Sequence, residues 1–133
     1  MNIAALILWI ITAAGGFVLL AKWVTGGGIK PENRTRLPAP VVFAHFAVAV
    51  VGLVLWIVYL IADVDALAWI SLGLLVLLAL TGLLMVTRWL PVRAGNADNA
   101  QAPETSFPLP VVGAHGLFAI ATVVTVLLTA IGI

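Results

Sequence analysis

Four long apolar stretches take up almost the whole of this 133-residue chain. They lie at about residues 3–24, 39–62, 66–90 and 109–132, and each is close to the ~20 residues that a helix needs to cross a bilayer. Inside lipid, the backbone of such a segment must satisfy its own hydrogen bonds, which an α-helix does. The sequence therefore predicts an all-α fold, an integral membrane four-helix bundle with a single transmembrane domain over residues 1–133.

The composition excludes several classes of protein. Only 8% of the residues are charged and cysteine is absent, so the chain has no disulfide framework, thiolate metal site or cysteine nucleophile. It also has no glycine-rich phosphate loop and no nucleophile with a base beside it, which argues against nucleotide binding, hydrolysis and nucleic-acid recognition. Any function must therefore lie inside the bundle, at its two ends or in a partner.

The positions of the charges predict an orientation in the membrane. All cationic side chains fall at or within the first and third connections, and the short second connection carries only Asp63 and Asp65. The positive-inside bias then places the basic loops 25–37 and 91–107 in the cytoplasm and both termini outside. We expect the membrane to be the cytoplasmic membrane of a bacterium. The cations are Lys22, Lys30, Arg34, Arg36, Arg88 and Arg93.

The chain contains an internal repeat. LPAPVVFAHFAVA at 37–49 and FPLPVVGAHGLFA at 107–119 share seven identities in thirteen positions at a shift of 70. Upstream, GFVLLAKWV at 16–24 matches GLLMVTRWL at 82–90 at a shift of 66. The pattern predicts two tandem helical hairpins, with halves at about 1–64 and 65–133, related by a pseudo-two-fold axis along the membrane normal.

The repeat contains both histidines of the chain, His45 and His115. Each lies five residues beyond a proline, Pro40 or Pro110, and hence roughly 8 Å along its helix. The second and fourth helices run in the same direction, so the two imidazoles are predicted at one depth on diagonal helices. The diagonal of a square bundle is about 11–14 Å, which we expect to be too wide for two imidazoles to share a small ion and suited to a flat macrocycle. Haem iron accepts one histidine on each face, so the pair is a candidate for axial ligation.

Small residues accompany the histidines. Gly16 and Gly82 are predicted at the same level on the first and third helices, where the absence of a side chain would admit the edge of a porphyrin. Ala49 and Ala119 follow their histidines by one turn on the same face and leave further room. Small residues in transmembrane helices also allow close helix packing, which is the alternative interpretation of this pattern.

Two basic residues also occupy equivalent positions in the repeat. Lys22 and Arg88 would lie within reach of haem propionates that point to the cytoplasm, although long cationic side chains at helix ends also serve as interfacial anchors. A histidine in a membrane helix can likewise make an interhelical hydrogen bond, which a gene duplication would copy. Ionisable residues inside membrane segments are nevertheless candidates for function, and here two occur in equivalent positions.

The arrangement resembles the small four-helix membrane cytochromes b and the haem-holding anchor subunits of respiratory enzymes. The resemblance covers the four helices and the histidine pair. It implies that His45 and His115 are the axial ligands of one haem b, and that the chain transfers single electrons, with quinone or a redox protein subunit as partner. A single histidine pair cannot carry an electron across the whole membrane, so a partner or a homo-oligomer would be needed. The chain is thus predicted to be an electron carrier or subunit and not a complete enzyme.

Three other functions stay open. The first is a structural or assembly subunit of a larger membrane complex, and the second is a divalent-metal site in which helix movement brings the histidines together. The third, a small transporter, would need a carboxylate inside the membrane, and no acidic residue is placed for that. The acidic residues are Glu32, Asp63, Asp65, Asp98 and Glu104.

The long third connection, VRAGNADNAQAPETS, is predicted to be a flexible loop.

Overall fold

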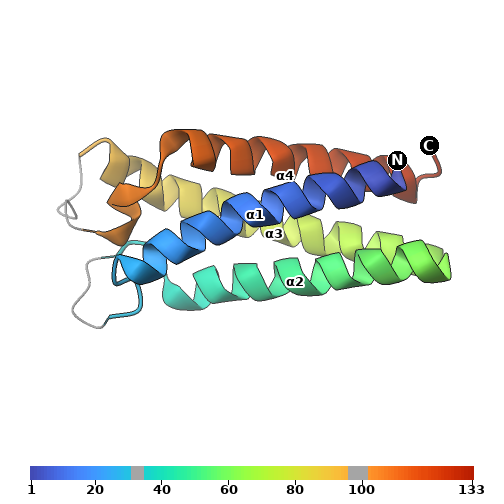
Figure 1. Ribbon diagram of the computed structural model, residues 1–133, viewed down its shortest axis with the longest axis horizontal. Helices are drawn as coiled ribbons and strands as arrows, with labels where there is room; N and C mark the ends of the chain where they lie inside the picture. Colours follow the sequence, from blue (N-terminus) through green and yellow to red (C-terminus); the bar gives the residue numbers. More distant parts are fainter. Residues whose placement is uncertain (31–34, 96–101) are drawn as a thin grey trace.

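The computed structural model describes residues 1–30, 35–95 and 102–133, and these residues form an all-helical bundle (Figure 1). All four long helices are long and apolar enough to cross a membrane, which indicates a membrane protein. The prediction of an all-helical chain with four candidate spans is confirmed. The long helices are α1 (Asn2–Thr25), α2 (Ala39–Ala62), α3 (Asp65–Arg93) and α4 (Leu109–Ala130).

The helix boundaries agree with the predicted ones to within three residues. The largest difference is at α3, which continues through Pro91 to Arg93. A proline in the last turn removes only one backbone hydrogen bond, and the amide of Ala94 still donates to the carbonyl of Leu90.

The third connection was predicted to be a flexible loop, and its described parts are partly helical. Besides the extension of α3, residues Pro103–Ser106 form a short 3-10 helix, η1. The segment 96–101 between them lies outside the described residues, as do Glu32, Arg34 and Asp98.

The paired prolines start α2 and α4 in the same way. Pro38 and Pro108 precede the two helices with φ near −63° and −66°, and each helix has a proline in its first turn. A proline ring fixes φ and lacks an N–H that the first turn would leave unpaired, so the helix begins at a defined residue. This shared start sets the depth of the histidine that follows in each helix.

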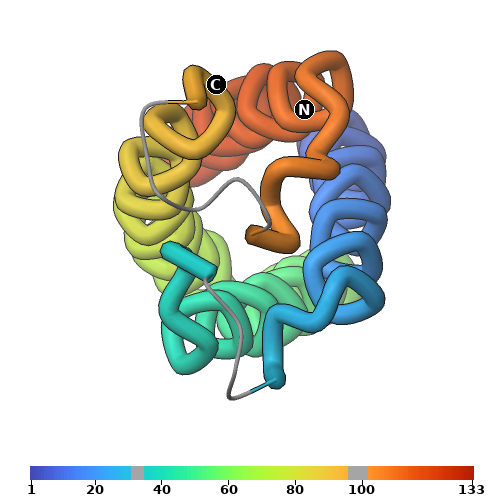
Figure 2. The backbone as a smooth tube through the Cα atoms, turned by 90° about the vertical axis from the view of Figure 1, so that its left-hand side faces the viewer, coloured from blue at the N-terminus to red at the C-terminus, as the bar shows by residue number. Residues whose placement is uncertain are grey.

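The four helices form a ring in chain order, seen end-on in Figure 2. α1 packs most extensively against α4, and α2 against α3, while α1–α2 and α3–α4 contacts are less extensive. Within the described residues the backbones of α2 and α4 do not approach each other closely, so these helices lie on opposite sides of the bundle as predicted. The first and third connections lie at one end, and both termini lie at the other end (Figure 1).

The buried side chains form two separate clusters. The larger one lies towards the termini and is centred on two tryptophans, Trp9 and Trp56, with Gly52 allowing the Trp9 ring to approach α2 closely. The smaller one lies at the end with the connections and contains Trp23, Leu37 and Val42. The histidines lie between these clusters.

Candidate functional site

The two histidines face each other across the bundle. His45 comes from α2 and His115 from α4, and the centroids of their imidazole rings are 6.5 Å apart with an interplanar angle of 60°. Both side chains are partly buried. The side chains thus span the diagonal that the sequence analysis expected to keep them apart, and no helix movement is needed to bring the rings together.

Each imidazole is held through its Nδ1 atom. The Nδ1 of His115 lies 2.8 Å from the carbonyl oxygen of Thr12, which can only accept, so this nitrogen carries the proton. The Nδ1 of His45 lies 2.8 Å from the hydroxyl oxygen of Thr81. Because the Thr81 hydroxyl donates to the carbonyl of Leu77 at 3.0 Å, its oxygen is available to accept from His45. Both rings then have a free lone pair on Nε2, as metal-binding histidines do.

The distance between the rings permits both imidazoles to bind one metal. A metal–imidazole bond of about 2 Å places each ring centroid about 3 Å from the metal. Two such distances add up to about 6 Å, which is close to the 6.5 Å observed between the centroids. Within the described part of the chain, no group of three or more His, Cys, Asp or Glu side chains could hold an ion.

The two predicted glycines lie against the imidazoles. A Cβ atom added at Gly16 would be 2.8 Å from Cε1 of His115, and one added at Gly82 would be 3.5 Å from Cε1 of His45. Each glycine therefore contacts the histidine of the other repeat half. Gly15 also borders His115, since its added Cβ would lie 3.5 Å from the Cβ of that histidine.

The level of the histidines differs from the rest of the bundle in the burial of its residues. Protein interiors are normally close-packed, and fully buried residues occur both above and below this level. None of the four helices has a buried residue at the histidine level, and the shortest such stretch covers about 13 Å of helix. The stretches without a buried residue are 10–22, 43–51, 79–88 and 109–121.

The other predicted site residues lie on both sides of the histidine level. Ala49 and Ala119 are partly buried, and Ala49 packs against the larger core cluster. Lys22 is partly buried in the last turn of α1. Arg88 is exposed, and its guanidinium group donates to the carbonyl of Arg36 at 3.3 Å.

A buried carboxylate lies at the end of the bundle that carries the first and third connections. η1 lies across the mouth of the ring (Figure 2) and packs against α1 and α3. Glu104 in η1 is 0% exposed. Its Oε2 accepts from the Thr35 hydroxyl at 2.9 Å, and its Oε1 accepts from the backbone amide of Arg36 at 2.6 Å. This side chain joins the first and third connections.

Two tryptophans complete the Glu104 network. The indole N–H of Trp23 donates to the hydroxyl of Thr35 at 3.0 Å, and that of Trp89 donates to the backbone carbonyl of Glu104 at 2.9 Å. Both tryptophans are buried, and they come from the last turns of α1 and α3. The network thereby links α1, α3 and the first and third connections at one end of the bundle.

We expect Glu104→Ala to destabilise the fold strongly. Removing the carboxylate leaves the Arg36 amide and the Thr35 hydroxyl without their acceptors, at a cost of about 2–4 kcal/mol. Glu104→Gln should cost less, because the amide oxygen still accepts one of the two hydrogen bonds. Thermal unfolding of the detergent-solubilised protein measures both values. Equal stability of Glu104→Ala and the unchanged protein would contradict a supporting role for the network.

Sequence reasoning missed four residues of this region: Thr12, Gly15, Thr81 and Glu104. A signal for one pair exists, because Gly15 and Thr81 occupy equivalent positions at the shift of 66. At these equivalent positions, one half of the repeat has the hydroxyl of Thr81 beside His45, and the other half has Gly15 beside His115. For Glu104, the dipeptide Pro-Glu occurs in both basic connections, although this pattern says nothing about burial.

Comparisons of the chain with protein-family models, with curated proteins and with solved structures find no match.

Proposed function

We propose that this chain is a b-type cytochrome-like membrane protein that holds one haem b between His45 and His115 and transfers single electrons. The observation that carries the proposal is the pair of imidazoles from α2 and α4, whose ring centroids are 6.5 Å apart. Both rings have Nδ1 bonded to an oxygen and Nε2 free, which is the state that ligation requires. Haem would supply an iron that alternates between the ferric and ferrous states, and so carries one electron.

Different residues of the chain would orient the two ligands and make room for the cofactor. The Thr12 carbonyl and the Thr81 hydroxyl orient the two ligands through their Nδ1 atoms. Gly16 and Gly82 keep side chains away from the imidazoles and from the space between the helices.

The remaining predicted residues would contact the periphery of the cofactor. Ala49 and Ala119 leave room one turn further into the membrane. Lys22 and Arg88, at the end with the connections, would neutralise propionates that point to that side.

The pseudo-two-fold relation is part of the proposal. An exchange of α1 with α3 and of α2 with α4 converts the extensive α1–α4 contact into the extensive α2–α3 contact. It also converts the contact between Gly16 and His115 into that between Gly82 and His45. This equivalence supports two related halves that supply one ligand each to a single cofactor.

The partners are proposed from the position of the site. Both histidines lie towards one end of the bundle, so electrons reach the other face only through a further carrier. A quinone, a redox protein subunit or a second copy of the chain would provide it. An assembly subunit without haem is the competing function, and the presence of haem separates the two.

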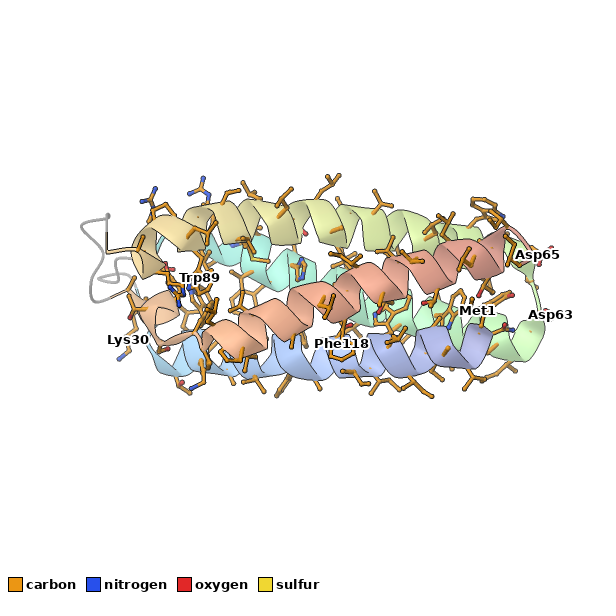
Figure 3. All side chains as sticks on the ribbon, turned by 90° about the horizontal axis from the view of Figure 1, so that it is seen from above. Met1, Lys30, Asp63, Asp65, Trp89 and Phe118 are labelled. Carbon is orange, nitrogen blue, oxygen red and sulfur yellow. The ribbon has the colours of Figure 1, made fainter. Side chains whose placement is uncertain are left out.

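The proposed orientation places the basic end in the cytoplasm. Lys30 lies at the end opposite Asp63 and Asp65 (Figure 3). The chain has no cysteine, so Lys30→Cys and Ile133→Cys each introduce a single label site. In intact bacterial cells, a membrane-impermeant maleimide should label Ile133→Cys and spare Lys30→Cys until the cells are permeabilised. The reverse pattern would invert the proposed topology.

The absorption spectrum tests the function directly. Protein purified from haem-replete cells should be red, and dithionite should sharpen the bands of a b-type haem. Haem content per chain should approach one. Colourless, fully helical protein would favour the assembly subunit instead.

A further inference from the structure

The two histidines are held unequally. His115 is bonded to a backbone carbonyl, which cannot rotate away, and Gly16 lies so close that an added Cβ would be 2.8 Å from the ring. His45 is bonded to the Thr81 hydroxyl, and the corresponding contact with Gly82 is looser at 3.5 Å. Movement of the His45 ring is therefore less restricted than movement of the His115 ring.

A cavity adjoins His45. It has a volume of about 170 Å³ and lies between α2 and α3, with almost entirely apolar walls. The pocket is partly open and is not an enclosed cavity. Two of the lining residues, Ala44 and Leu77, are exposed on the outer surface of the bundle, so the cavity borders the region that lipid would cover. The lining residues are Ala44, His45, Val48, Leu77, Leu78 and Thr81.

We infer that His45 is an exchangeable ligand, and that its displacement into this cavity opens a binding site for a small uncharged diatomic molecule. The inference rests on the proposed haem site. In the exchange, Nε2 of His45 would release the iron that haem supplies, and the diatomic ligand would bind the iron in its place. No electron or proton is transferred in this step, and His115 stays bound. Molecules such as CO and NO dissolve in lipid and would enter between α2 and α3.

The hydroxyl of Thr81 holds His45 but does not depend on it for a hydrogen-bond partner. It lies within reach of two carbonyls of its own helix, at 3.0 Å from Leu77 and 3.1 Å from Leu78. The hydroxyl therefore keeps a partner when the imidazole leaves. The carbonyl of Thr12 offers His115 no comparable freedom, because its direction is fixed by α1.

The experiment measures CO binding to the dithionite-reduced haem protein by stopped-flow spectroscopy. We expect the low-spin spectrum to be replaced by that of a CO complex. Ala44→Leu fills the cavity and should slow CO binding at least tenfold. Ala114→Leu, at the equivalent position beside His115, should leave the rate within about twofold. Thr81→Val removes the bond that retains His45 and should speed CO binding, because losing such a partner typically weakens a histidine ligand by about 10–100-fold, whereas Thr81→Ser keeps the hydroxyl and should restore the slower rate.

The outcomes separate this inference from the proposed function. Haem protein that keeps its reduced spectrum under CO would overturn the exchange and leave the haem site intact. Equal slowing by Ala44→Leu and Ala114→Leu would also overturn it, because the cavity would then not matter. If Ala44→Leu fails to fold, an unchanged rate in Thr81→Val has the same consequence. Protein without haem would overturn both proposals.

Discussion

Replacing either histidine with alanine should abolish the low-spin spectrum that two imidazole ligands produce. His45→Ala and His115→Ala each leave the iron with one protein ligand, so each variant should be high-spin or lose most of its haem. Both rings belong to one site, with centroids 6.5 Å apart, so the two single variants should resemble each other. Absorption spectra and haem content of the purified variants measure the effect.

The double variant distinguishes one site from two. If His45 and His115 complete a single site, the double replacement should add little to the loss caused by either single replacement. Additive losses would point to separate binding sites. Unchanged low-spin spectra in both single variants would exclude these histidines as the ligands, and the helicity of each variant serves as the control for folding.

Gly16→Ala should damage the site far more than Gly82→Ala. The new methyl group at residue 16 would lie 2.8 Å from Cε1 of His115, so the ring must move, and its Nε2 with it. The methyl group at residue 82 would make an ordinary contact of 3.5 Å with His45. We expect Gly16→Ala to lose most of its haem or its low-spin state, and Gly82→Ala to retain both. Leucine at either position should expel the cofactor.

Apoprotein stability is the control for the glycine variants. Glycines that serve only helix packing would weaken the apo bundle when they are replaced. Glycines that make room for a ligand ring would change haem binding while the apoprotein unfolds at nearly the same temperature. Equal haem content in Gly16→Ala and Gly82→Ala would contradict the unequal contacts on which this prediction depends.

The helices could be predicted from the sequence because lipid imposes a length and a backbone requirement on each span. The depth of the histidines also followed from a local signal, since a proline pair opens both α2 and α4. The burial of Glu104 could not be predicted in this way. Its carboxylate contacts Thr35, 69 residues away, and such a contact depends on how two connections meet in space.

The histidine pair was predicted, whereas the details of its geometry were not. Spacing along a helix gives the level of a residue but not the rotation of the helix about its axis. The partners of Nδ1, Thr12 and Thr81, depend on that rotation. The expected separation also considered helix axes alone, and two inward-pointing imidazoles reduce it to 6.5 Å between ring centroids.

Electron paramagnetic resonance of the oxidised, haem-loaded protein tests the central claim most directly, when combined with the haem content of the same sample. We predict one haem per chain and a low-spin ferric signal typical of two imidazole ligands, which is lost in His45→Ala and in His115→Ala. A purely high-spin signal, or a folded protein that takes up no haem, would contradict a haem held between these two histidines.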